Sequence, residues 1–340
     1  MGTVAPHEMG SGMVRTVIGA VARFCALMVA VSMVTFALVS ASPIDPVSTN
    51  AGQAAYGRMS EEKREQLRSY WDADTPVWER FGSWARGALS GDLGTSLRYG
   101  KPVVQVIAER AGNTLMLMGV AWVISGALGF ALGVAAGAHP GGGLDRAVRA
   151  WCFVISSTPA FWLGLVLLTV FAVMLGWFPF GFSVPIGVDA AQVSLGERLY
   201  HLVLPALTLS ITGVANIALH TREKTIDVLA SDYARFARSR GEGTGRIVRA
   251  HGLRNLVLPA LTLQFSQVAE IFGGSVLVEQ VFSYPGLGQA AVTAGVGGDA
   301  PLLVGIALAS AALVFFGNGV ANVLYGVLDP RMRTGVRAHV

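Results

Sequence analysis

Long apolar runs, separated by short stretches that hold most of the basic side chains, constrain the fold of this chain more than any other feature. A helix needs about 20 apolar residues to cross a bilayer. With 14% charged residues and a mean hydropathy of +0.55, the 340-residue chain is too apolar for a soluble domain. The pattern predicts an all-α membrane protein with six transmembrane helices. The runs are residues 14–41, 113–138, 151–175, 199–220, 256–281 and 302–328. The third run is interrupted at Thr158-Pro159, where the missing backbone donor is expected to bend the helix.

The distribution of basic residues predicts which side of the membrane each loop faces. Arg146 and Arg149 lie between the second and third runs, and a larger basic stretch lies between the fourth and fifth. Because lysine and arginine accumulate in cytoplasmic loops, these stretches and both termini are expected on the cytoplasmic side of a bacterial inner membrane. The tail adds Arg331, Arg333 and Arg337.

The chain is expected to divide at these boundaries. Residues 1–13 are expected to be disordered, and residues 14–41 to form the first helix. A secretory signal peptide is the alternative for that run, but its apolar core is longer than such signals require. Residues 42–110, whose charges nearly balance, form a large external loop, followed by a five-helix core over 111–328 and a tail over 329–340.

The basic stretch over 222–255 is the most informative loop. Burying one such charge at the centre of a bilayer costs about 2.5 to 3.5 kcal/mol, so eight would cost on the order of 20 kcal/mol or more. The stretch therefore lies outside the membrane. Its basic residues are Arg222, Lys224, Arg235, Arg238, Arg240, Arg246, Arg249 and Arg254.

Two short helices are predicted within this stretch. Apolar residues from Ile226 to Ala237 recur at helical spacing, and the glycines of Gly241-Glu242-Gly243 end that helix. Thr244 is the expected N-cap of a second helix over 245–253. Such a compact element with apolar ridges is suited to docking into a groove on a soluble partner. The alternative is an ordinary basic cytoplasmic loop.

The stretch resembles the cytoplasmic EAA-type loop of ABC importer permeases. Its form DYxRxARxxG…HxLRN is similar to the oligopeptide, dipeptide and nickel branch, with Arg235, Phe236 and Ala237 in place of the EAA triplet. The resemblance implies that this loop couples the subunit to cytoplasmic ATPases. The implied coupling residues are Asp232, Tyr233, Ala234, Arg235, Phe236, Ala237, Arg238, Gly241, His251, Leu253, Arg254 and Asn255.

Other motifs resemble the same branch and occur in the family's order. They are GDLGTSL at 91–97 with the following KPVVQVIAER, then Glu279 with FSYPGLG, and DPRMR at 329–333. The resemblance implies that FSYPGLG forms a loop near the external mouth of the pathway. Its candidate gate residues are Phe282, Tyr284, Pro285, Gly286, Leu287 and Gly288.

Two further patterns lie inside the apolar runs. Gly129, Gly133 and Gly137 recur every four residues, with Gly126 near the same line, so another helix can approach closely; ordinary membrane-helix glycine content is the alternative. Gln264, Gln267 and Glu270 are spaced three residues apart and are expected on one side. They are candidate pathway residues, together with Glu279, and a hydrogen-bonded cluster between helices is the alternative.

The chemistry that the sequence lacks is also informative. No GxxxxGK[ST] motif is present, so the chain has no P-loop for nucleotide. Its six histidines form no HxxxH or HExxH pair, and Cys25 and Cys152 predict neither a disulfide framework nor a metal site. No basic face with interleaved aromatics indicates nucleic acid. We expect a subunit that is not an enzyme and holds no cofactor or metal.

The resemblance implies a permease subunit that is embedded in membrane lipid and forms half of the translocation pathway. It is most similar to the first of the family's two paired permeases. Its implied partners are a second homologous permease, two ABC ATPases or one fused ATPase carrying ATP and Mg²⁺, and an extracytoplasmic solute-binding protein. Di- or oligopeptides are the expected substrates, and nickel or a metal chelate is the alternative. An ion-coupled secondary transporter and a non-transporting scaffold, which belong to different functional classes, compete with this interpretation.

Overall fold

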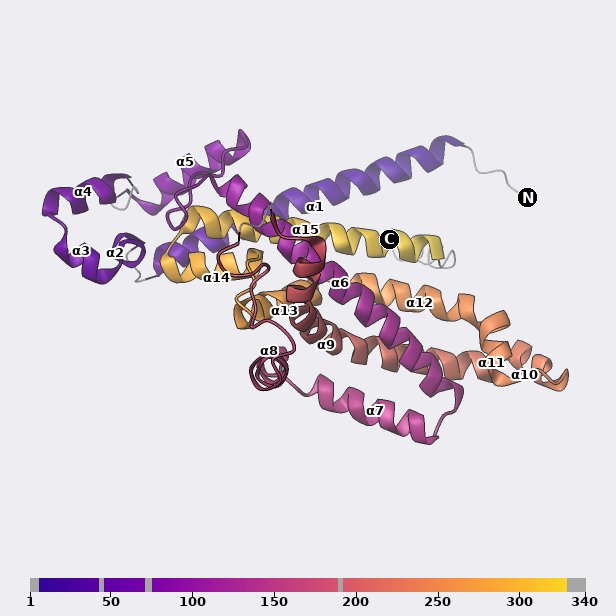
Figure 1. Ribbon diagram of the computed structural model, residues 1–340. Helices are drawn as coiled ribbons and strands as arrows, with labels where there is room; N and C mark the ends of the chain where they lie inside the picture. Colours follow the sequence, from indigo (N-terminus) through magenta and orange to yellow (C-terminus); the bar gives the residue numbers. More distant parts are fainter. Residues whose placement is uncertain (1–5, 43–45, 71–74, 189–191, 329–340) are drawn as a thin grey trace. The chain divides into compact units, whose positions relative to one another are not determined.

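The computed structural model describes residues 6–42, 46–70, 75–188 and 192–328, and these fold into helices joined by turns (Figure 1). No β-strand occurs within these ranges, in which Thr95 and Pro102 form one isolated bridge. The chain divides into two compact units, which are described separately. The first comprises residues 1–109 and 290–315, and the second comprises residues 110–289 and 316–340.

The first unit begins with a long helix and continues with four short ones. Helix α1 starts at Pro6, so residues 6–13, which were expected to be disordered, are helical; residues 1–5 lie outside the described ranges. The expected external loop is itself helical over much of its length. The helices are α1 (Pro6–Ala41), α2 (Pro46–Ala51), α3 (Gln53–Arg58), α4 (Glu61–Tyr70) and α5 (Val77–Leu89).

A buried carboxylate organises the GDLGTSL motif in the first unit. Asp299 Oδ2 accepts hydrogen bonds from Ser96 Oγ at 2.6 Å and from the Arg98 backbone N–H at 3.0 Å. Its Oδ1 accepts from the Leu302 N–H at 3.2 Å, which caps the start of α15 (Ala300–Leu328). Asp299 thus joins this motif to a helix start some 200 residues further along the chain.

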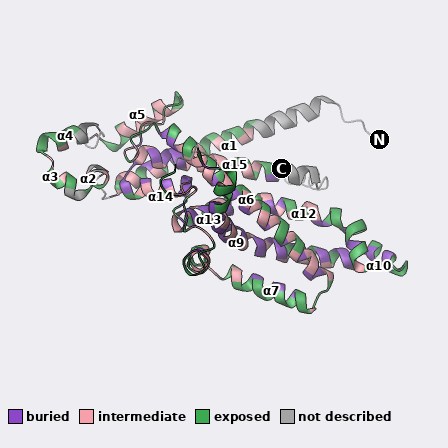
Figure 2. Ribbon diagram, in the orientation of Figure 1, coloured by how far each residue is buried: buried purple, intermediate pink, exposed green. Residues whose placement is uncertain are grey.

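Helix α9 (Leu195–Ala230) is the most buried long helix of the second unit (Figure 2). Of its apolar window, 61% is buried, against 28% for α6 (Val103–Ala138), whose residues from Arg110 onward belong to this unit. The other elements of the unit are α7 (Gly143–Ser156), α8 (Ala160–Leu167) with a π-helical continuation (Leu168–Met174), α10 (Asp232–Ser239), α11 (Thr244–Ile247), a π-helical turn (Val248–Gly252), α12 (Leu253–Ser266), α13 (Val268–Val281), the start of α14 (Leu287–Gly297) and the end of α15.

The glycine line of α6 lies against α9, which confirms the predicted close approach. A Cβ atom added to Gly133 would lie 2.6 Å from the carbonyl oxygen of Ala218, and one added to Gly137 would lie 2.6 Å from that of Arg222. Gly129 faces Ile217 in the same way. Only glycine permits this separation between the two backbones.

Two of the expected spans are bent. Helices α7 and α8 meet at 104° around Pro159, which cannot donate a backbone hydrogen bond, and this confirms the predicted interruption. Helices α12 and α13 meet at 52° at Gln267. Among the described residues, four helices are long and apolar enough to cross a membrane, and the number rises to six if each bent pair counts as one span.

Candidate functional site

The basic stretch folds as an ordered structure that begins where α9 ends. Ser231 is extended, with φ −68° and ψ 159°, and separates α9 from α10. The prediction of a single amphipathic helix from Ile226 to Ala237 is therefore wrong. Ile226 belongs to the last turns of α9, and the chain turns at Ser231 before α10 starts at Asp232.

The predicted end of the first helix at Gly241 is confirmed. We call residues 241–243 the elbow, and the helical stretches before and after it the first and second arms. Gly241 has φ +81°, a conformation that glycine adopts without the steric cost that a side chain brings. Its N–H donates to the Arg238 carbonyl at 2.9 Å, and the Glu242 N–H donates to the Ala237 carbonyl at 3.1 Å. This pair of bonds is a Schellman motif, which satisfies the last carbonyls of α10 and reverses the chain.

The second arm differs from the prediction in its start and its end. Thr244 is not the N-cap, because Gly243 occupies that position without any side-chain hydrogen bond. The arm is not a separate short helix either. From Thr244 it continues through the π-helical turn over Val248–Gly252 directly into α12.

A hydrophobic cluster fixes the two arms, which we call the coupling segment (residues 232–255), onto the rest of the second unit. Phe130 and Val134 of α6, which are partly buried, pack against it. The buried members are Val228, Leu229, Ala234, Ala237, Ile247, Val248 and Leu256. Because the cluster includes residues from α9, both arms and α12, the coupling segment is packed against the candidate span α9 and the start of α12.

Polar contacts join one arm to the other. Glu242, at the elbow, lies 3.1 Å from His251 Nε2 and 3.8 Å from Arg246 Nε. Asn255 Nδ2 donates to the Tyr233 hydroxyl at 3.2 Å, which connects the end of the segment to its beginning. These contacts use His251, Asn255 and the hydroxyl of Tyr233 to hold the coupling segment together, while the Tyr233 side chain stays 40% exposed.

The outer surface of the coupling segment combines apolar and basic side chains. Phe236 is 66% exposed and Tyr233 is 40% exposed, and they lie one turn apart on the same side of α10. Leu253 is 43% exposed, and Arg235 and Arg254 are exposed as well. Arg238 instead donates to the Leu229 carbonyl at 3.0 Å. We call Tyr233 and Phe236 the exposed apolar pair.

The three polar residues of the fifth run do not share one face, contrary to the prediction. Gln264 is buried and donates to the Trp122 carbonyl at 2.6 Å and to Ser125 Oγ at 3.0 Å, both on α6. Gln267 is buried at the bend, whereas Glu270 is exposed beyond it. The 52° bend at Gln267 breaks the regular spacing on which the prediction relied.

Glu279 and the FSYPGLG loop pack together inside the second unit. The carboxylate of Glu279 accepts hydrogen bonds from Thr114 Oγ1 at 2.7 Å and from the Gln289 N–H at 3.0 Å. Gly286 and Gly288 lie so close to this carboxylate that neither has room for a side chain. Glu279 thus holds the loop from inside.

The loop itself is mostly inaccessible to solvent. Phe282, Tyr284 and Leu287 are buried, and the Pro285 carbonyl accepts a hydrogen bond from Asn113 Nδ2 at 2.9 Å. The six candidate gate residues therefore form an ordered, packed turn. The terminal DPRMR motif lies outside the described residues.

The fold and the ordered basic segment define a multi-pass helical membrane protein, and comparison with known proteins gives its family. The family described as "Binding-protein-dependent transport system inner membrane component" matches residues 129–334. This chain belongs to that family. The matched region contains the coupling segment, the polar residues of α12 and α13, and the FSYPGLG loop.

Relatives align along nearly the whole chain. The oligopeptide transport system permease protein AppB of Bacillus subtilis is 34% identical over 90% of this chain and 95% of its own length. A putative peptide transport system permease protein of Brucella abortus is 34% identical over 92% of this chain and 97% of its own. The glutathione transport system permease protein GsiC of Escherichia coli is 35% identical over 89% of this chain and 94% of its own length.

Proposed function

We propose that this chain is a permease subunit of an ATP-driven peptide importer in a bacterial inner membrane. The relatives named above are permeases for oligopeptides, peptides and glutathione, which supports peptides as the substrate class. The subunit would form half of the pathway and pair with a second homologous permease. An extracytoplasmic binding protein would deliver the peptide, and both termini would be cytoplasmic.

The coupling segment is where this subunit would receive the energy for transport. Nucleotide binding through a P-loop requires a sequence that this chain lacks, so ATP and Mg²⁺ would be bound by separate or fused ATPase subunits. The exposed apolar pair carries the proposal. It offers two aromatic side chains outside the apolar spans, on a segment whose buried cluster is shared with α9 and α12.

Such a surface suits a helix-in-groove contact, in which an aromatic anchor enters a pocket of a soluble partner. Closure of the ATPases would move the coupling segment. Because the segment is packed on spanning helices, the spans would shift with it and change which side of the membrane the pathway faces.

Reconstitution into proteoliposomes tests the proposed function. We expect uptake of a labelled tripeptide only when the second permease, the binding protein and the ATPases are present with ATP. Uptake driven by an ion gradient without ATPases would indicate a secondary transporter instead. Uptake of nickel in place of the peptide would identify a metal as the substrate, and no uptake of either under any condition would indicate a scaffold.

Two variants of the coupling segment separate docking from membrane insertion. Gly241→Pro cannot adopt the φ of +81° that the elbow requires, because proline is fixed near −65°. Arg235→Glu reverses an exposed charge on α10. We expect both variants to remain in the membrane but to lose co-purification with the ATPases. Intact complexes in both variants would contradict the assigned role.

A further inference from the structure

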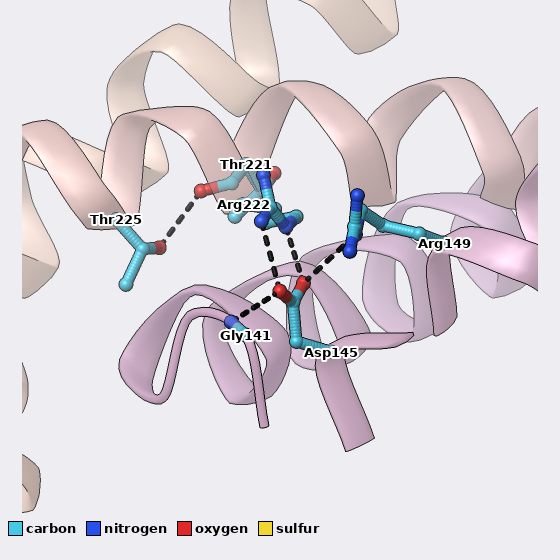
Figure 3. Close-up of polar contacts among 6 residues, drawn as sticks. All are labelled: Gly141, Asp145, Arg149, Thr221, Arg222 and Thr225. Carbon is cyan, nitrogen blue, oxygen red and sulfur yellow. Dashed lines mark hydrogen bonds and ion pairs between the residues drawn. The ribbon is translucent and has the colours of Figure 1, made fainter. Parts of the chain in front are cut away.

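A buried ion pair joins α7 to α9 close to the coupling segment (Figure 3). Asp145 lies in the first turn of α7, and its side chain is completely buried. Arg222 of α9 donates to both of its carboxylate oxygens, from Nε to Oδ1 and from Nη2 to Oδ2, the latter at 2.9 Å. Arg149 Nε lies 3.6 Å from the same oxygen, Oδ1.

Asp145 also holds the turn between α6 and α7. Its Oδ2 accepts a hydrogen bond from the Gly141 N–H at 2.8 Å, and Gly141 has φ +79°. The carboxylate therefore connects the turn after α6, the start of α7 and the side of α9. Because a forked arginine contact fixes angle as well as distance, this arrangement defines how α7 is oriented on α9.

The apolar contact between the same helices is less specific. Val148 and Cys152 of α7 pack with Ala215 and Ala218 of α9, and Leu219 of α9 packs against the same cluster. Apolar contacts of this kind are non-directional. The Asp145–Arg222 pair supplies the directional contact that sets the register.

Arg222 is well placed to follow the coupling segment. It is eight residues before Ala230, the last residue of α9, which corresponds to about 12 Å of unbroken helix. The chain breaks at Ser231, but α10 shares a buried cluster with the end of α9. A displacement of α10 therefore reaches Arg222 through this cluster and the last turns of α9. On the other side of the pair, α7 leads to the 104° bend and α8.

We propose that Asp145 and Arg222 are positioning residues that transmit movement of the coupling segment from α9 to α7. This inference rests on the proposed function, since it presumes that ATPases move the coupling segment. The pair makes α7 follow α9 during each ATP-driven change. Without the ion pair, α9 still moves but α7 does not move with it.

Site-directed labelling of the assembled transporter tests this transmission. In a chain with Cys25 and Cys152 replaced by alanine, one cysteine replaces exposed Ala147 on α7 or exposed Ala230 at the end of α9. Maleimide labelling rates are measured with and without ATP plus vanadate. The test variant combines Asp145→Leu with Arg222→Met, which replaces a branched and a linear charged side chain with branched and linear apolar ones and removes both charges together.

We expect trapping with ATP and vanadate to change both labelling rates at least threefold in the parent chain. In the double variant, the rate at position 230 still responds and the rate at position 147 does not. An unchanged response at 147 in the double variant would overturn the transmission role and leave the proposed function intact. No response at either position in the assembled parent would overturn both.

Two further variants serve as a control and as a replacement for the double variant. Lys224→Met with Asp227→Leu removes an exposed ion pair from the same part of α9, whose charges lie 3.3 Å apart, and we expect both responses to persist. If the buried double variant does not assemble, Asp145→Asn provides the same comparison with little change in side-chain shape. A full response at 147 in an assembled Asp145→Asn complex would again contradict the proposal.

Discussion

His251 Nε2 lies 3.1 Å from a carboxylate oxygen of Glu242, so the second arm of the coupling segment is connected to its elbow. The Glu242 side chain is only 14% exposed, although it lies in a loop that faces solvent. Its contacts with His251 and Arg246 keep the arm at a fixed angle to α10. The shape that a partner would meet thus depends on this acidic residue.

Glu242→Gln is expected to weaken the elbow without unfolding the protein. Contacts of this partly exposed kind contribute at most about 1 kcal/mol, so membrane insertion and yield should not change. ATP-driven uptake should fall several-fold, because the two arms no longer keep a single angle. Asp227→Asn is the matched control, since that carboxylate is 67% exposed and pairs with Lys224 at 3.3 Å. Equal uptake by both variants would contradict the role given to Glu242.

Phe236→Ala is expected to weaken the attachment of the ATPases. The side chain is 66% exposed, so its loss costs little folding stability. An aromatic anchor at an interface typically contributes about 2 kcal/mol or more, which corresponds to roughly a 30-fold loss of affinity. Affinity between the detergent-solubilised permease pair and the ATPases measures the effect. Leu195→Ala, which removes a 68% exposed side chain at the other end of α9, should bind normally.

Gly133→Ala is expected to separate α6 from α9. The added Cβ would lie 2.6 Å from the Ala218 carbonyl oxygen and from Thr221 Cβ, so the backbone of one of the two helices must move. Such overpacking costs about 1 to 3 kcal/mol and should lower the melting temperature of the purified subunit. Gly119→Ala on the same helix has nothing within 4 Å of the new atom and should be neutral or stabilising. Similar melting temperatures for both variants would show that the seam is not tightly packed.

Thr114→Val is expected to loosen the FSYPGLG loop. The Thr114 hydroxyl donates to Glu279 at 2.7 Å and accepts from the Leu287 N–H at 2.8 Å, so valine leaves two buried groups without their partner. The cost should be about 1 to 3 kcal/mol. Faster proteolysis near exposed Ser283 would report the loosened loop. Thr114→Ser, which keeps the hydroxyl, should behave like the parent, and equal proteolysis of both variants would count against this role.

Local patterns in the sequence predicted much of the fold. The apolar runs located the helices, Pro159 predicted the bend between α7 and α8, and Gly241 predicted the elbow of the coupling segment. Each of these depends on a property of the residue itself. A missing backbone donor or a missing side chain acts in the same way in almost any surrounding structure.

Two of the errors came from features that depend on tertiary contacts. The break at Ser231 has no proline or glycine beside it, and the chain turns there because the cluster of α9 and α10 residues packs in that arrangement. The bend at Gln267 separated Glu270 from the two glutamines in the same way. The Asp145–Arg222 pair joins residues 77 positions apart, and no local pattern indicates it.

The most direct test of the central claim is a crosslink from the coupling segment to an ATPase. With Cys25 and Cys152 replaced, Ser239→Cys at the exposed end of α10 carries a photoactivatable crosslinker in membranes that contain the whole transporter. Leu277→Cys on α13, which is 48% exposed, is the control. We expect a crosslinked product with the ATPase from position 239 only, and no labelling of that cysteine by an impermeant reagent outside intact cells. Labelling from outside, or equal crosslinking from position 277, would contradict the account.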